Sequence, residues 1–157
     1  MRSFRDPAQW SEWVPAVLLG TPSRSMWVAV SCNRAQGHIL VEGHHPARRP
    51  SLAALTTGAT TEVINALRYR RRRDITVPAI GNGLEDRELL VADPGDESAL
   101  VTIRNTQSIL GRWSVHTHRL PELCWALKHA HGLVSGTESA AAIVPTDLAA
   151  TIAGGAP

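Results

Sequence analysis

Lysine is nearly absent from this chain of 157 residues. Fifteen of its sixteen basic residues are arginine, and Lys128 is the one lysine. Arginine makes bidentate contacts with phosphate and carboxylate groups better than lysine does. A genome rich in G and C would favour arginine codons and produce the same bias. The composition therefore permits an anionic partner without requiring one.

Cysteine and long apolar runs are also scarce. The two cysteines, Cys32 and Cys124, lie far apart in the sequence. We expect two buried thiols rather than a disulfide, as is usual in a reducing compartment. No apolar run approaches the roughly 20 residues that span a bilayer, and the N-terminal segment lacks the apolar stretch of a signal peptide. We therefore expect a cytoplasmic protein with no membrane partner.

Motifs that identify enzymes are missing as well. The chain has no Gly-x-Ser-x-Gly, no Cys-x-x-Cys and no His-x-x-x-His. The "GNG" at 81–83 lacks the lysine or third glycine of a phosphate or dinucleotide loop. His116 and His118 would point the same way on a strand and could both reach one zinc ion. We expect no cofactor and name no catalytic residue, and a metal-assisted hydrolase is the most distant functional alternative.

The hydrophobic pattern predicts one globular domain over residues 1–157, with a tail that frays from about residue 150. Apolar residues make up 43% of the chain, which is typical of a globular protein, and the length allows a sizeable core. Alternating apolar residues predict strands. The expected strands are 26–32, 38–45, 75–80, 88–92, 99–105 and 112–118. Pro78 indicates an edge position for the strand that contains it.

Helical spacing and capping residues predict the helices. One begins at Asp6 and Pro7 and ends before Pro15. Two further helices are expected at 51–55 and 60–73. Gly58 separates them, and Thr60 or Thr61 would be the N-cap of the second. Two more are expected, one from Pro121 to Gly132 and a short one after Pro145. The predicted fold class is α+β, a mostly antiparallel sheet built from two hairpins with helices packed on one side.

The strongest local signal is "RYRRRRDI" at residues 68–75, where five arginines fall within six positions. Charge changes sign where this run ends. Residues 1–73 hold eleven Lys or Arg and four Asp or Glu, for a net charge of +7, while residues 74–157 hold five and ten, for −5. Such an imbalance between halves indicates an electrostatic partner, or neutralisation of one half by the other.

Three interpretations of the arginine run stay open. It could bind phosphates, because guanidinium groups displace the counterions of a nucleic acid. It could be a solvated helix end, where cations complement the helix macrodipole. It could also dock onto an acidic protein surface. The acidic segment 85–97 supplies such a surface, in the same chain or in another copy, so a homo-oligomer is one expected outcome.

The strands 99–105 and 112–118 are expected to form the second hairpin. A polar face of this hairpin could extend a phosphate-binding surface, although one face of an antiparallel sheet is ordinarily solvated and polar. Trp27 and Tyr69 are the aromatic residues that we expect to be exposed, and Trp113 should point inward. The leading hypothesis is a small nucleic-acid-binding or regulatory accessory protein with little base preference. The alternative is a non-catalytic interaction or self-assembly protein with complementary basic and acidic halves. The residues expected to contact nucleic acid are Arg48, Arg49, Arg68, Arg70, Arg71, Arg72, Arg73, Arg104, Arg112, His116 and His118.

Overall fold

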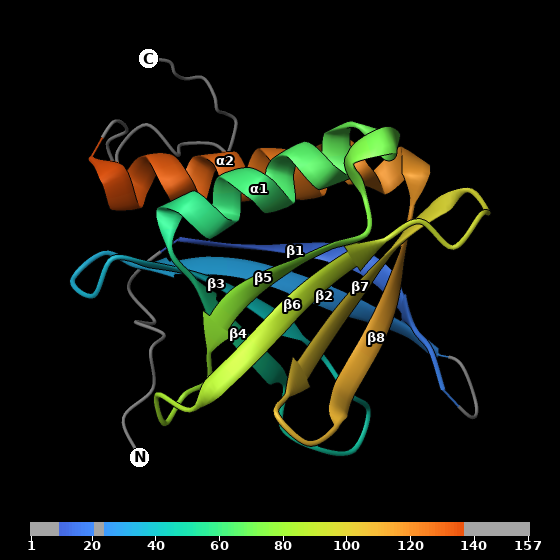
Figure 1. Ribbon diagram of the computed structural model, residues 1–157, viewed down its shortest axis with the longest axis horizontal. Coiled ribbons are helices and arrows are strands. Elements are labelled where there is room, and N and C mark those ends of the chain that lie inside the picture. Colours follow the sequence, from blue (N-terminus) through green and yellow to red (C-terminus); the bar gives the residue numbers. More distant parts are fainter. Residues whose placement is uncertain (1–9, 21–23, 137–157) are drawn as a thin grey trace.

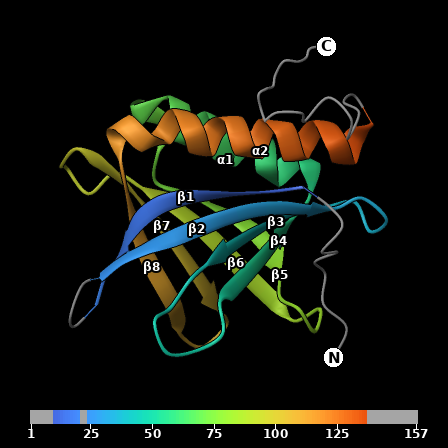
Figure 2. The ribbon, with the colours of Figure 1, turned by 180° about the vertical axis from the view of Figure 1, so that it is seen from behind.

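In the part of the chain that the structure describes, eight antiparallel strands form a closed barrel, and two α-helices lie next to each other on one side of it (Figures 1 and 2). The computed structural model describes residues 10–20 and 24–136. The α+β class, the antiparallel pairing and the placement of the helices agree with the sequence prediction. The sheet is larger than predicted, because the described residues form eight strands where six were expected, and these close into a barrel rather than forming two hairpins.

The described chain runs through four strands and a helix, and then through the same order again. The first half consists of β1 (Ser11–Leu18), β2 (Arg24–Asn33), β3 (His38–Gly43), β4 (Ser51–Leu55) and α1 (Thr57–Arg68). The second half consists of β5 (Ile75–Ile80), β6 (Asp86–Ala92), β7 (Ser98–Asn105), β8 (Ile109–His116) and α2 (Leu120–Ser135). Two short 3₁₀ helices, η1 (Arg70–Arg72) and η2 (Thr117–Arg119), lie between α1 and β5 and between β8 and α2.

The two halves of the barrel meet at two short seams. The pairs Val17–Ser114 and Leu18–Trp113 join β1 to β8, and the pair Ala54–Ile80 joins β4 to β5. The strands β4 and β8 each form one side of a seam, and each is followed in the chain by a helix: α1 follows β4 and α2 follows β8. Pro78 lies where β5 has no β4 partner, which is the edge-like position that a residue without an N–H group tolerates.

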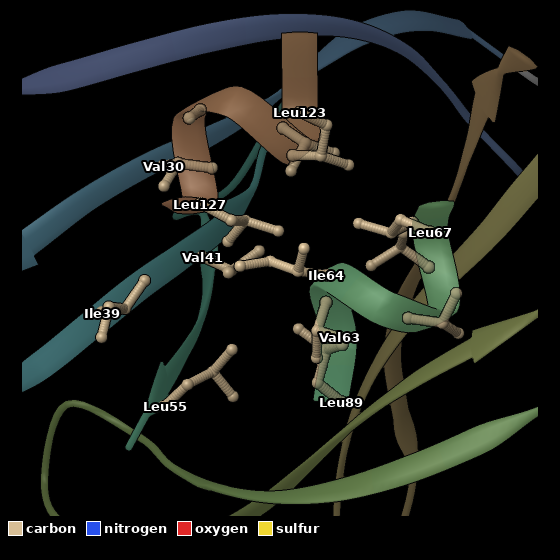
Figure 3. Packing of buried hydrophobic residues seen from close by; sticks show 14 of the residues in the cluster. Val30, Ile39, Val41, Leu55, Val63, Ile64, Leu67, Leu89, Leu123 and Leu127 are labelled. Carbon is tan, nitrogen blue, oxygen red and sulfur yellow. The ribbon is translucent and has the colours of Figure 1, made fainter. Parts of the chain in front are cut away.

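The core fills the barrel and continues between the barrel and the helices. Alternate residues of the strands point inward, so Ala99, Val101 and Ile103 of β7 are buried as predicted. Figure 3 shows the close-up of this cluster, in which side chains of both helices meet those of the strands. The labelled residues are Val30, Ile39, Val41, Leu55, Val63, Ile64, Leu67, Leu89, Leu123 and Leu127. Cys32 and Cys124 are buried, and burial raises the pKa of each thiol.

Trp113 of β8 lies fully inside the barrel, as predicted, and two glycines make room for it. A Cβ atom on Gly43 would lie 2.2 Å from the Trp113 ring, and one on Gly111 would lie 2.4 Å from it. The indole Nε1–H donates a hydrogen bond to the carbonyl oxygen of His44 at 3.0 Å. A side chain at either glycine would therefore have to displace a buried ring.

The predicted N-terminal helix is wrong in its described part, because the residues from Ser11 to Pro15 belong to strand β1 (Ser11–Leu18). Asp6 and Pro7 lie outside the described residues. Within β1, Val14 and Ala16 are buried, while the apolar residues Trp13 and Val17 point outward and are about two-fifths exposed. The apolar outer residues produced the helical spacing that misled the prediction.

The segment 51–55 is also a strand rather than a helix. All five of its residues are buried, so it shows no alternation of apolar and polar positions. Gly58 does not interrupt α1 but lies in its first turn. The N-cap is Thr56, whose Oγ1 accepts a hydrogen bond from the N–H of Ala59 at 3.1 Å. Of the arginine run, only Arg68 is in the last turn of α1.

The second helix passes through Gly132, where we expected it to end, and is terminated by Gly136 with φ of 78°. Its buried stripe of Leu123, Cys124, Leu127 and Ala130 is as predicted. His118 belongs to η2 rather than to a strand. The predicted helix after Pro145 and the tail from about residue 150 lie outside the described residues. None of the described helices could span a membrane.

Candidate nucleic-acid interface

The arginine run lies where the chain leaves α1 and turns toward β5. The N–H of Tyr69 bonds to the carbonyl oxygen of Asn65 and ends the helix, and Tyr69 itself is extended. After η1, Asp74 has a positive φ of 69° and its N–H donates to the carbonyl oxygen of Val91 at 2.7 Å. These changes of backbone direction give the five arginines different surroundings.

Arg73 points back to the fold. Its Nε and Nη2 donate to the carbonyl oxygens of Ala66 and Leu67 at 3.2 Å each, and its Nη1 donates to that of Ser98 at 3.1 Å. The two helix carbonyls lie at the negative end of the α1 macrodipole, where a cation is favourable. Arg73 therefore ties the end of α1 to the start of β7.

Arg70 is neutralised by the acidic loop between β6 and β7. Its guanidinium donates to both carboxylate oxygens of Asp93, and its Nη2 also donates to the backbone oxygen of Asp96 at 3.3 Å. The hydrogen bond from Arg70 lowers the pKa of Asp93, and the same bond raises the pKa of Arg70. The arginine run thus pairs with the acidic segment 85–97 of the same chain, through the ion pair of Arg70 with Asp93.

The side chains of Arg68, Arg71 and Arg72 are exposed and form no ion pair or hydrogen bond with any described residue. The guanidinium carbon of Arg68 lies 5.4 Å from the centroid of the Tyr69 ring, and that of Arg72 lies 5.7 Å from it. The Tyr69 side chain is 43% exposed, as predicted. We call Arg68, Tyr69, Arg71 and Arg72 the arginine–tyrosine patch.

The other predicted arginines lie elsewhere. Arg48 and Arg49 are exposed in the loop between β3 and β4, at the end of the barrel away from the helices (Figure 1). The Nη2 of Arg48 lies 3.4 Å from Nδ1 of His45. Arg104 forms an ion pair with Glu88 at 2.7 Å, and Arg112 is exposed on the outer side of β8. The structure therefore does not join these four residues to the arginine–tyrosine patch.

His116 and His118 lie closer to the run. They are connected to it through the β6–β7 loop, because Thr117 donates its N–H to the carbonyl oxygen of Glu97 at 3.0 Å. The two imidazoles contact one another, and Nε2 of His116 lies 3.9 Å from a carboxylate oxygen of Glu97. In residues 10–20 and 24–136, no three or more His, Cys, Asp or Glu side chains are grouped as metal ligands.

Sequence reasoning missed a buried histidine at the opposite end of the barrel. Nε2 of His45 lies 2.8 Å from Oγ of Ser51, and its ring packs edge-on against Trp113. Burial lowers the pKa of His45, and the nearby Arg48 lowers it further. A serine–histidine pair suggests a nucleophile, but Ser51 is buried and Nδ1 of His45 faces a cation where a catalytic triad has a carboxylate. The pair is better explained as a satisfied core contact.

Exposed apolar residues on the outer face of β1 and β2 were also not predicted, apart from Trp27. Trp13, Val17 and Leu19 are about two-fifths exposed, and Trp27 pairs with Pro15 between them. These side chains form one stripe on the barrel wall. A stripe of this kind is a candidate contact surface, although the described residues do not identify what would cover it.

The comparisons with known proteins add no functional information. No protein-family model, no curated protein and no solved structure matches the chain.

Proposed function

We propose that this protein binds nucleic acid through the arginine–tyrosine patch and contacts mainly the phosphate backbone. One observation carries the proposal: the guanidinium groups of Arg68 and Arg72 lie over the exposed Tyr69 ring, and neither they nor that of neighbouring Arg71 is neutralised by any described residue. Bringing three cations together raises the free energy of the unbound surface. A polyanion relieves this repulsion and releases its own condensed counterions, which favours binding.

Tyr69 gives the patch a second way to contact nucleic acid. An aromatic face can stack on any base, so it adds affinity without demanding a sequence. The guanidinium groups of Arg68 and Arg72 already lie near the ring, within reach of the phosphates that flank a base at this position. The patch therefore supports binding with little base preference, and better binding to single strands than to duplexes.

The arginines differ in how freely they could contact a phosphate, so we propose only some of them as contacts to nucleic acid. Arg68, Arg71 and Arg72 are available as they stand. Arg70 becomes available when its bond to Asp93 breaks, whereas Arg73 is held by three carbonyl groups of the fold. Arg48, Arg49, Arg104 and Arg112 would have to act at separate places on the barrel.

Fluorescence anisotropy with labelled oligonucleotides tests the proposal. Single-stranded DNA, duplex DNA and single-stranded RNA are titrated at two or more salt concentrations. The test variant is Arg68→Ala/Arg71→Ala/Arg72→Ala. The matched control is Arg24→Ala/Arg34→Ala/Lys128→Ala, which removes three exposed basic residues that are not among the predicted contacts and changes the net charge equally.

We expect the test variant to lose at least tenfold in affinity. The slope of log K against log salt should fall by about 2 to 3, because each phosphate contact contributes about 0.7 to 0.9. The control should lose much less. Equal losses in both variants would show that binding follows net charge alone, and no binding by the wild-type protein at low salt would exclude the function.

A non-catalytic interaction protein is the second candidate. The observation that favours it is the bond between Arg70 and the acidic β6–β7 loop, because the same loop of another copy, or a foreign acidic surface, could contact the patch in the same way. Light scattering at low and high salt tests the first case. A mass that falls from an oligomer to a monomer as salt rises supports it, and a monomer under both conditions excludes it.

A further inference from the structure

We propose that His116 and His118 form a two-imidazole chelate for a divalent transition-metal ion, with Cu²⁺ bound more tightly than Zn²⁺. The Nδ1 atoms of the two rings face one another at 2.5 Å, and the ring centroids are 4.3 Å apart. Both side chains are exposed, so an ion can reach them from solvent. This inference does not depend on nucleic-acid binding.

The backbone determines which nitrogen of His116 carries a lone pair. The N–H of His118 donates to Nδ1 of His116 at 3.2 Å, so this nitrogen is an acceptor and the ring proton is on Nε2. The contact between the rings then requires that His118 donates its Nδ1–H to the same nitrogen. Binding a metal ion at both Nδ1 atoms needs a tautomer change in His118, whose proton moves to its Nε2 by exchange with water. The ion also replaces the backbone N–H of His118 at the one lone pair of His116 Nδ1.

Glu97 is placed as the outer partner of this chelate. Its carboxylate lies 3.9 Å from Nε2 of His116, the nitrogen that faces away from His118. A histidine that binds a metal usually donates its other N–H to a carboxylate or carbonyl group. The position of Glu97 is fixed by the hydrogen bond from Thr117 and by the pairing of Ser98 with His116. Its side chain is 86% exposed and can close the remaining distance.

The geometry requires a small movement. Metal–nitrogen distances of about 2.0 to 2.1 Å place two ligand nitrogens about 3 Å apart, so the rings must separate by less than about 1 Å. His118 lies in a three-residue turn at the surface, where side-chain rotation meets little resistance. Two protein ligands leave the other coordination positions to water, so the ion exchanges readily. Imidazole ligands suit Cu²⁺ and Zn²⁺ and do not suit Mg²⁺ or Ca²⁺.

Isothermal titration calorimetry with Cu²⁺, Zn²⁺ and Mg²⁺, together with electron paramagnetic resonance of the Cu²⁺ complex, tests the chelate on the full chain. We expect one Cu²⁺ per chain, with nitrogen couplings from two imidazoles, weaker Zn²⁺ binding and no Mg²⁺ binding. His116→Gln/His118→Gln should lower the Cu²⁺ affinity at least tenfold. Glu97→Gln should lower it about tenfold, the usual cost of losing an outer carboxylate.

The matched control is His38→Gln/His131→Gln, which removes two other partly exposed histidines. Circular dichroism establishes that each variant is folded. Unchanged Cu²⁺ affinity in His116→Gln/His118→Gln would overturn the proposal, as would an equal loss in the control or a wild-type protein that binds no Cu²⁺.

Discussion

Arg70 donates two hydrogen bonds to Asp93, one from Nε to Oδ2 and one from Nη2 to Oδ1. This pair divides a run of arginines that looks uniform in the sequence. Arg70 is satisfied by a carboxylate, Arg73 by backbone carbonyls, and Arg71 and Arg72 face solvent. Because the pKa of Asp93 is lowered, its carboxylate stays ionised at neutral pH and the pair persists there.

Removing the Asp93 carboxylate should strengthen nucleic-acid binding. Asp93→Asn releases Arg70 for one further phosphate contact, while the amide oxygen can still accept the hydrogen bond from Gly95. We expect a severalfold higher affinity and a salt slope steeper by about 1. The control is Asp86→Asn, which removes the same charge from an exposed position of β6. An equal gain in both variants would contradict release of Arg70.

Substitutions of Arg73 and Arg71 should have different effects, the first on protein stability and the second on nucleic-acid binding. Arg73→Ala removes three hydrogen bonds from a charged donor to backbone carbonyls, two of them at the end of α1. We expect the free energy of unfolding, measured by urea denaturation, to fall by about 1 to 3 kcal/mol. Arg71→Ala should leave it within about 0.5 kcal/mol and should weaken nucleic-acid binding instead. The reverse pattern would refute these assignments.

Two glycine-to-alanine changes should act in opposite directions. Gly43→Ala places a methyl group where the Trp113 ring lies, so the free energy of unfolding should fall by about 2 to 3 kcal/mol or more. Gly58→Ala lies in a helix with open space around the new methyl group and should raise it by about 0.5 to 1 kcal/mol. Thermal and urea denaturation measure both. A neutral Gly43→Ala would mean that Trp113 moves freely.

Protein stability should fall as the pH drops below the ordinary histidine range. The pKa of His45 is lowered in the fold, so the unfolded chain takes up a proton at about pH 6.5 while the folded chain does not. Unfolding is therefore favoured increasingly from that pH down to the lowered pKa of His45. His45→Gln should flatten this part of the curve of unfolding free energy against pH. His131→Gln serves as the control variant. If it flattens the curve of unfolding free energy against pH as much as His45→Gln does, the pH dependence does not come from His45.

Alternation identified most of the sheet but not all of it. Alternating apolar and polar side chains predict strands at 38–45 and 99–105, and the structure has β3 at His38–Gly43 and β7 at Ser98–Asn105. The pattern failed in β1, whose outward face carries Trp13 and Val17. It failed again in β4, where Leu52 and Ala54 are covered on the outer side by a small cluster with Leu40. A strand that is buried on both faces has apolar residues at almost every position, so its sequence lacks the two-residue alternation that predicts a strand.

The sequence predicted which residues accumulate at the candidate site, but not how those residues are arranged in space. The sequence shows that arginines accumulate at residues 68–73, and it correctly suggests that Tyr69 is exposed. It does not show that Asp93, 23 residues away from Arg70, is brought to it by the β5–β6 hairpin. Nor does spacing reveal that Arg48 and Arg49 lie at the other end of the barrel (Figure 1). Those relations depend on strand register.

The barrel closes through three residue pairs at its two seams, whereas the strands within each half pair along most of their length. Mechanical pulling or heat should therefore part the molecule into two four-stranded leaves before either leaf frays. The connection between α1 and β5, which carries Tyr69, Arg71 and Arg72 of the arginine–tyrosine patch, would act as the hinge between those leaves. A polyanion held at this hinge would also restrain their separation.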